Sequence, residues 1–177
     1  MSGQPLTLEA LVARIPAGGK HFRVEASEAE RHAMALALGI VEVVDLTADL
    51  EVRPVGAEAF AVRGTLKAAV VQTDVVTLEP VRQEVSEEID LTLLPAEGDS
   101  RAMVRAKLQP GTEEAEDRDV YHKGRIDLGA IVLEHLALGL DPYPKSPGSE
   151  FPGHIESAEE AQDSPFAALA PLKREPE

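Results

Sequence analysis

The 177-residue chain contains no cysteine and no tryptophan, and its aromatic side chains are limited to four phenylalanines and two tyrosines. Without cysteine there can be no disulfide, no thiol nucleophile and no thiolate metal ligand. No apolar run reaches the roughly 20 residues that a membrane-spanning helix needs, and residues 1–5 lack the basic start of a signal peptide. These absences predict a cytoplasmic protein, with no membrane contact, whose core is built from Val, Leu, Ile and Ala.

Basic residues are also scarce relative to acidic ones. The chain carries 17 Lys and Arg against 32 Asp and Glu, a net charge of −15. Residues 71–177 hold 10 of the basic and 23 of the acidic residues, a net of −13. Such a charge repels nucleic-acid phosphates and attracts basic partners, although high solubility alone would account for the same composition. We therefore expect free RNA to bind weakly.

Three long segments alternate apolar and polar residues with the period of a half-buried strand: 44–52, 60–70 and 81–93. The connections 53–59 and 77–80 are short and contain Pro or Gly, so neighbouring strands should pair antiparallel. The positions predicted to face the core are Val44, Leu46, Ala48, Leu50, Val52, Phe60, Val62, Leu66, Ala68, Val70, Val81, Val85, Ile89, Leu91 and Leu93.

Two helices should bracket this meander. Ser27 and Glu30 form a capping box, and Gly39 should end the helix that follows. Asp127 should cap a second helix, which Gly139 ends. The apolar stripe of this helix is predicted at Leu128, Ile131, Val132, His135 and Leu138. Residues 19–26 add a candidate strand, with Phe22 and Val24 inward.

These elements predict one α+β domain over residues 1–140: a curved antiparallel meander, open or half-closed like a barrel, with two or three helices. The acidic, aperiodic residues 95–120 predict a mobile loop. Residues 141–177 are interpreted as an acidic tail that ends in a short docking helix. Ser164 would cap that helix, and Phe166 and Leu169 would share one of its faces.

No catalytic constellation stands out. The five histidines show no pair at the spacing of a helical metal site, so we predict no metal and no cofactor. One residue in the segment 71–80 is unusual, because alternation puts Asp74 on the face that should be buried. A carboxylate there needs hydrogen-bond donors, or the strand must break its alternation so that Asp74 meets water.

Several short motifs occur in an order that resembles the YceD family, the large ribosomal RNA subunit accumulation proteins of bacteria. The motifs are the capping-box helix and the residues Gly64–Ala68, Gln72–Pro80, Asp119–Tyr121, Ile126–Leu128, Glu134, Leu138–Pro142 and Pro165–Lys173. The resemblance implies a role in accumulation and processing of large-subunit ribosomal RNA, without established catalytic residues. Relatives often carry cysteine at the positions of Asp74 and Thr77, so a thiolate role at this turn is not open to this chain.

The resulting hypothesis is a non-enzymatic ribosome-biogenesis factor that binds a basic ribosomal protein or assembly factor and touches RNA only within a complex. The alternative is an enzyme or small-molecule binder that uses a pocket in a half-closed sheet. A cavity lined by several buried polar groups would favour that alternative. The candidate interaction residues are Gln72, Asp74, Thr77, Pro80, Glu84, Glu88, Asp90, Phe166 and Leu169.

Overall fold

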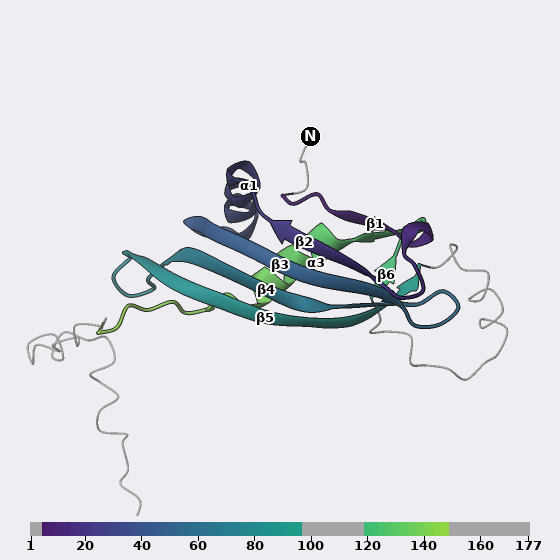
Figure 1. The fold of residues 1–177 in the computed structure, drawn as a ribbon. Coiled ribbons are helices and arrows are strands. Elements are labelled where there is room, and N and C mark those ends of the chain that lie inside the picture. The colour runs from purple at the N-terminus through teal and green to yellow at the C-terminus, as the bar shows by residue number, and fades with distance from the viewer. Residues whose placement is uncertain (1–4, 97–118, 149–177) are drawn as a thin grey trace, which may run out of the picture. The chain divides into compact units, whose positions relative to one another are not determined.

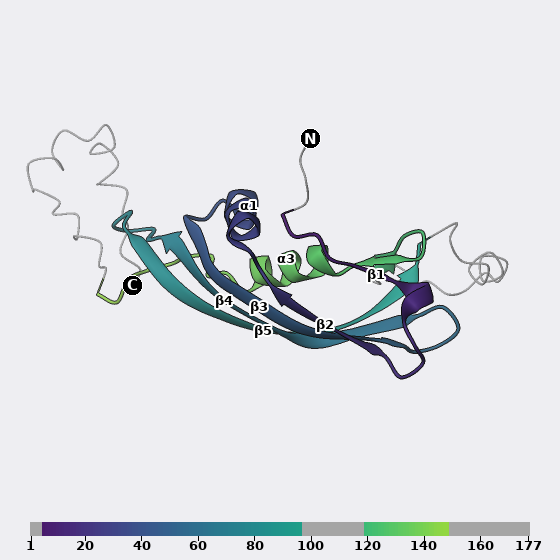
Figure 2. The ribbon, with the colours of Figure 1, turned by 45° about the horizontal axis from the view of Figure 1, so that its top comes forward.

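The structure, a computed structural model, describes residues 5–96 and 119–148. In these residues the chain forms a curved sheet with the strand order β2-β3-β4-β5-β6, a separate pair of short strands, β1 and β7, and the helices α1 and α3. Both helices lie on the concave side of the sheet, and no described helix covers the convex side (Figures 1 and 2). The bounds are β1 Glu9–Leu11, β2 Lys20–Glu25, α1 Glu28–Leu38, β3 Glu42–Pro54, β4 Phe60–Thr73, β5 Pro80–Pro95, β6 Val120–Tyr121, β7 Arg125–Asp127 and α3 Leu128–Leu138, with a short 3-10 turn at Val12–Arg14.

The sheet is a meander over most of its width. Strands β2 to β5 pair antiparallel in chain order, as the short connections predict. β6 differs, because it pairs parallel with the end of β5 through Leu94↔Val120 and Pro95↔Tyr121. The sheet is therefore mixed, and the prediction of a purely antiparallel sheet is wrong at this strand. The half-closed barrel is wrong too: β2 and β6 are the sheet's two edges, and helices rather than a closing sheet cover the concave side (Figure 2).

Alternation along the three long strands places most of the core as predicted, but Val81 and Leu91 are only half-buried and β3 departs from the pattern at one point. Leu46, Leu66 and Ile89 are fully buried on the concave face. A β-bulge shifts the pairing of β3 with β4 between Val43 and Asp45. Because a bulge inserts one extra residue into a strand, Val43 is buried there instead of the predicted Val44, which is only half-buried.

The two helices begin where their capping residues predict. At α1 the Glu30 amide donates to Ser27 Oγ at 3.4 Å and the Ser27 amide donates to Glu30 Oε2 at 2.9 Å, which completes the capping box. At α3 the Ala130 amide donates to Asp127 Oδ1 at 2.9 Å. The predicted stripe of α3 needs a correction, because Leu138 is 72% exposed and Leu136 is buried in its place.

That correction follows from helix geometry. Leu128, Val132 and Leu136 are spaced four residues apart and form one row, which packs into the core. Gly129 lies beside this row, and a side chain there would collide with the backbone of Leu6. α3 therefore packs against the sheet through this row and against the backbone of residues 6–8 through Gly129. Leu138 is left on the exposed side of the helix.

Several predictions fall outside the described part of the chain. These are most of the acidic loop, residues 97–118, and the tail beyond residue 148 with the docking helix that contains Phe166 and Leu169. Within residues 5–96 and 119–148, no helix is long and apolar enough to cross a membrane.

Candidate functional site

The turn between β4 and β5 is organised around the carboxylate of Asp74, whose side chain has no exposed surface. Oδ1 accepts hydrogen bonds from the amides of Val76 at 2.7 Å and Thr77 at 3.0 Å, and Oδ2 accepts one from the amide of Ser146 at 2.6 Å. The buried carboxylate thus has the donors that it needs, and the alternative of an Asp74 in water is wrong.

These donors also determine the charge of Asp74. The hydrogen bond from the Ser146 backbone, followed by that from Thr77, lowers the pKa of the Asp74 carboxyl far below its ordinary value, although burial acts in the opposite direction. Asp74 is therefore ionised at neutral pH and serves as an acceptor that closes the turn.

Residues beyond α3 return to this turn. Gln72 Nε2 donates to the carbonyl of Asp141 at 3.0 Å. Gln83 donates to the carbonyl of Gly139 at 2.9 Å and accepts from the amide of Asp141 at 3.1 Å. Two amide side chains on adjacent strands thus hold residues 139–141 against the sheet, although residues from 141 onward had been interpreted as a tail.

The interior of the turn is polar, whereas several of its exposed side chains are apolar. Leu78 is 77% exposed and adopts a left-handed backbone with φ of +62°. Its amide donates to the carbonyl of Asp74 at 3.0 Å, which holds this conformation in place. Val75 and Tyr143 are also exposed, and the Val75 amide donates to the carbonyl of Pro144 at 3.0 Å. The turn presents these side chains on a backbone with little freedom.

The acidic candidates on β5 lie on the convex face of the sheet. Glu84, Glu88 and Asp90 are exposed there at alternate positions. Arg82 pairs with Glu84, and Arg63 on β4 pairs with Asp90, each at 3.0 Å. Glu88 has no ion-pair partner among the described residues. It is consequently the acidic side chain of this strand that is most available to a new partner.

Lys67 stands in the middle of the same face. It is exposed, directly opposite Thr47 on β3 and Ser86 on β5. Side chains two positions along from a direct partner are about 7–8 Å away, which brings acidic groups around it at the diagonal positions. These are Asp45 and Asp49 on β3 and Glu84 and Glu88 on β5. Lys67 is therefore surrounded by four carboxylates, and the nearby cations Arg23 and Arg82 are paired with two of them, Asp49 and Glu84.

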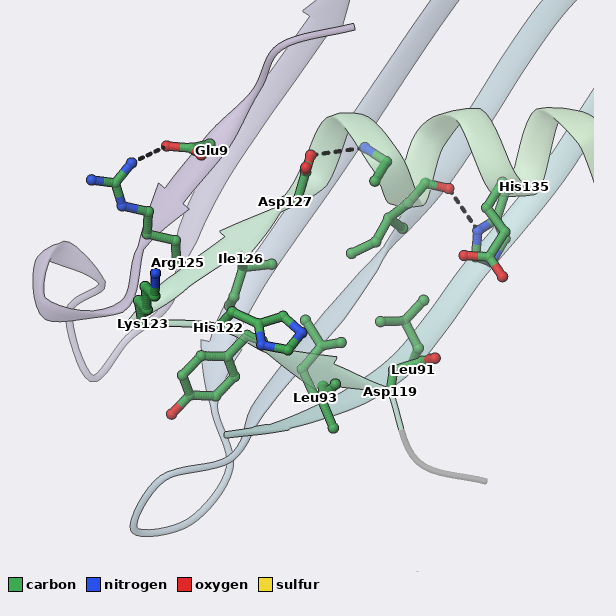
Figure 3. A pocket seen from close by; sticks show the side chains of 15 residues that line it. Glu9, Leu91, Leu93, Asp119, His122, Lys123, Arg125, Ile126, Asp127 and His135 are labelled. Carbon is green, nitrogen blue, oxygen red and sulfur yellow. Dashed lines mark hydrogen bonds and ion pairs between the residues drawn. The ribbon is translucent and has the colours of Figure 1, made fainter. Parts of the chain in front are cut away.

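A pocket of about 860 Å³ lies between β5, α3 and the segment from Asp119 to Asp127 (Figure 3). Its apolar floor is formed by Leu91, Leu93, Ile126 and Ile131, and Leu91 is only half-buried because it faces this space. The pocket thus lies at the edge of the sheet and not inside a half-closed barrel.

Several of the polar groups around the pocket already have partners. Arg125 donates to Glu9 at 3.0 Å, and His135 Nδ1 lies 2.9 Å from the carbonyl oxygen of Ile131. The carboxylate of Asp127 caps α3, as described above. No group of acidic and histidine side chains in the described residues is arranged to hold a metal ion. A small-molecule site would need free polar groups buried in the cavity, whereas the acidic and basic side chains that line this pocket are exposed or half-buried.

Comparison of the sequence prediction with the structure divides the candidates into three groups. Gln72, Asp74 and Thr77 meet in one turn, and Pro80 begins β5 next to it. Glu84, Glu88 and Asp90 share the convex face, whereas Phe166 and Leu169 lie outside the described residues. Gln83 and Ser146 were missed. Gln83 could have been found, because it is a polar residue at an inward position of β5.

Known proteins were compared with the whole chain. A family model described as "Large ribosomal RNA subunit accumulation protein YceD" matches residues 62–173. No curated protein matches the chain, and no solved structure does.

Proposed function

This chain belongs to the YceD family of large ribosomal RNA subunit accumulation proteins, and we propose that it acts by binding a basic ribosomal protein or assembly factor through the convex face of its sheet. The family description implies a role in accumulation of large-subunit ribosomal RNA and describes an accumulation factor rather than an enzyme. The proposed basic character of the partner rests on the charges of the sheet's convex face.

The observation that carries the proposal is the ring of carboxylates on the convex face. Asp45, Asp49, Glu84 and Glu88 surround Lys67, and of these Asp45 and Glu88 have no ion-pair partner among the described residues. A partner that brings Lys or Arg side chains would gain complementary charge there without first breaking a salt bridge. Complementary charge of this kind also speeds the encounter of two proteins.

The same face argues against RNA as the direct ligand. A phosphate group at Lys67 would meet four carboxylates, and the cations beside them, Arg23 and Arg82, are already paired with Asp49 and Glu84. The whole chain also has a net charge of −15. Phosphate contacts supply most of the non-specific affinity for nucleic acids, and here that contribution is repulsive. RNA contact is thus proposed only within a complex, where the partner provides the basic surface.

The test is the ratio of large to small ribosomal subunits in a strain that lacks the gene and is complemented with variants. We expect the deletion to lower this ratio, and Glu88→Lys to restore it less well than the unchanged gene does. Glu79→Lys is the matched control, because it makes the same charge change in the exposed β4–β5 turn. A normal subunit ratio in the deletion strain, or equal restoration by the two variants, would overturn the proposal.

The choice between a basic protein and RNA is tested with the opposite charge change. Lys67→Gln removes the central cation and leaves the carboxylates in place. It should strengthen capture of basic ribosomal proteins and weaken any binding of ribosomal RNA fragments, because the two ligands have charges of opposite sign. Weaker capture of basic proteins by Lys67→Gln, together with weaker RNA binding, would assign the face to RNA.

A further inference from the structure

The long strand β5 has an outer edge with very little pairing. β5 runs from Pro80 to Pro95, and on its outer side β6 pairs with only Leu94 and Pro95. The opposite edge of the sheet is β2, which is much shorter, at six residues. Long open edges are uncommon in native sheets, because their free amides and carbonyls are a template for another strand.

Two hydrogen bonds show which backbone groups of β5 face this edge. The Leu94 amide donates outward, to the carbonyl of Asp119 at 2.9 Å, whereas the carbonyl of Glu79 accepts inward, from the amide of Asp74 at 2.8 Å. The pairing with β4 continues without a register shift from Phe60↔Leu93 to Thr73↔Pro80. Since backbone groups alternate in direction along a strand, even-numbered residues point their amides and carbonyls outward.

The outward backbone groups of the stretch 86–92 are those of Ser86, Glu88, Asp90 and Thr92. No backbone group of the described residues pairs with them. The side chains of the same four residues point to the convex face and are exposed. An added strand would therefore place its own convex-side residues next to Glu88 and Asp90, where opposite charge is favourable.

The concave side of this edge leads into the pocket. Leu91 and Leu93 project from β5 into it (Figure 3), and Ile131 of α3 also lines it. A strand added at the edge would direct every second side chain into this space. An exposed Glu134 also lines the pocket, so a lysine or arginine could lay its aliphatic part on the leucines and place its charge near the carboxylate.

We propose that residues 86–92 of β5 take up an extended, basic segment of the partner protein as an additional strand, with alternate side chains of that segment in the pocket. In this arrangement main-chain hydrogen bonds supply affinity, and the pocket and the acidic convex face select the side chains. The inference rests on the proposed function for the basic character of the partner, but its backbone pairing is tested separately.

The probe is a seven-residue peptide that alternates lysine and valine, prepared as two isomers. One isomer is N-methylated at the lysine amides and the other at the valine amides, so charge and composition are identical. In an added antiparallel strand, the residues opposite Ser86, Glu88 and Asp90 place their side chains on the convex face and their amides towards β5, so the lysine amides face β5 when the lysines lie beside these carboxylates. We expect the two isomers to differ at least about tenfold in affinity for the full-length protein, measured by calorimetry. Equal affinity would overturn the inference.

A variant of the protein tests the same edge from the other side. Ser86→Pro removes an outward amide and leaves the bonds to β4 intact, and proline is tolerated at such edge positions. It should weaken binding of the unmethylated peptide about tenfold relative to Ser86→Ala, which keeps the amide. If Ser86→Pro does not fold, the affinities of the two peptide isomers for the unchanged protein still test the inference.

Hydrogen exchange identifies the residues involved. In the free protein the amides of Glu88 and Asp90 should exchange quickly and that of Ile89 slowly, and the peptide should protect the first two. Protection of Glu88 and Asp90 without peptide, or self-association of the chain that Ser86→Pro abolishes, would show another occupant of the edge and overturn the inference.

The two proposals fail in distinguishable ways. If both peptide isomers bind equally and Glu88→Lys weakens both, the convex face binds basic segments without an added strand. If the isomers differ but deletion of the gene leaves the subunit ratio normal, the edge accepts a strand and the proposed cellular function is wrong.

Discussion

At its N-terminal end β5 follows a turn in which the polar groups point inward. Towards its C-terminal end it borders a pocket, and no described residue pairs with the backbone of its outer edge at residues 86–92. In the turn, the carboxylate of Asp74 is buried and accepts three backbone amides. At the pocket, Leu91 is half-buried and the outward amides of residues 86–92 have no described backbone partner. At the turn, the hydrogen-bonding groups thus stabilise the fold, whereas along residues 86–92 the outward backbone groups remain available to a binding partner. We expect substitutions at the first end to change stability and those at the second to change binding.

The largest effect should come from Asp74→Ala, which leaves the amides of Val76, Thr77 and Ser146 without their acceptor in a buried place. We expect the midpoint of thermal unfolding to fall by roughly 10 °C. Asp74→Asn keeps one acceptor oxygen and should lose less. An unchanged midpoint for Asp74→Ala would show that the turn does not depend on this carboxylate.

Because Asp74 is buried and holds the turn, Asp74→Ala would disturb a binding module and an enzyme alike, so this variant cannot separate the two kinds of protein.

Gly139→Ala should have the next largest effect, at the point where the end of α3 approaches β5. A Cβ at Gly139 would lie 2.5 Å from Val85 Cγ1 and 2.9 Å from Glu87 Cγ. Overpacking of this kind costs about 1–3 kcal/mol, which urea unfolding would measure. Gly18→Ala is the control, because no atom lies within 4 Å of a Cβ there. Equal stability of the two variants would mean that α3 can shift away from β5.

Acid should weaken the turn that Asp74 holds. The pKa of Asp74 is lowered in the folded state, so its stabilising contribution is complete above the ordinary Asp pKa of about 3.9 and is lost as the pH falls further. Unfolding followed between about pH 6 and pH 2.5 should show this loss, with a smaller slope in Asp74→Asn. The same slope in both proteins would assign acid sensitivity to other carboxylates.

The smallest effect is expected at the pocket end, for Glu9→Gln. The pair of Glu9 with Arg125 is exposed on both sides, at 45% and 59% of the side-chain surface. Such pairs contribute about 0–1 kcal/mol, and added salt reduces this further. Urea unfolding at low and high salt would measure it. A loss as large as that of Asp74→Ala would contradict the contrast between the two ends.

Much of the fold followed from local patterns. The three long strands were predicted because a period of two along 44–52, 60–70 and 81–93 reflects one buried face, whatever the strand packs against. The helix starts at Ser27 and Asp127 were also local, since a cap satisfies amides only three residues away. The candidate site was predicted only in part: the position of Asp74 was recognised as unusual, and its acceptor role was one of two alternatives.

Where the prediction failed, the cause lies far along the chain. Val43 is buried in place of Val44 because β3 has a bulge where it pairs with β4. Leu136 is buried in place of Leu138 because α3 packs both against the sheet and against the backbone of residues 6–8. The pocket could not be predicted, since it joins residues of β5, α3 and the segment around Tyr121.

By itself the sequence determined the acidic charge, the absence of thiol chemistry, the strand periods and the helix caps, because each depends on composition or on residues within a turn of one another. Only the tertiary structure decided that Asp74 is buried and ionised, since its donor Ser146 lies 72 residues away. It also decided which side chains surround Lys67, and that β5 borders a pocket with an outer edge that no described residue pairs at residues 86–92. Strand order and register determine such neighbours, and no local pattern encodes them.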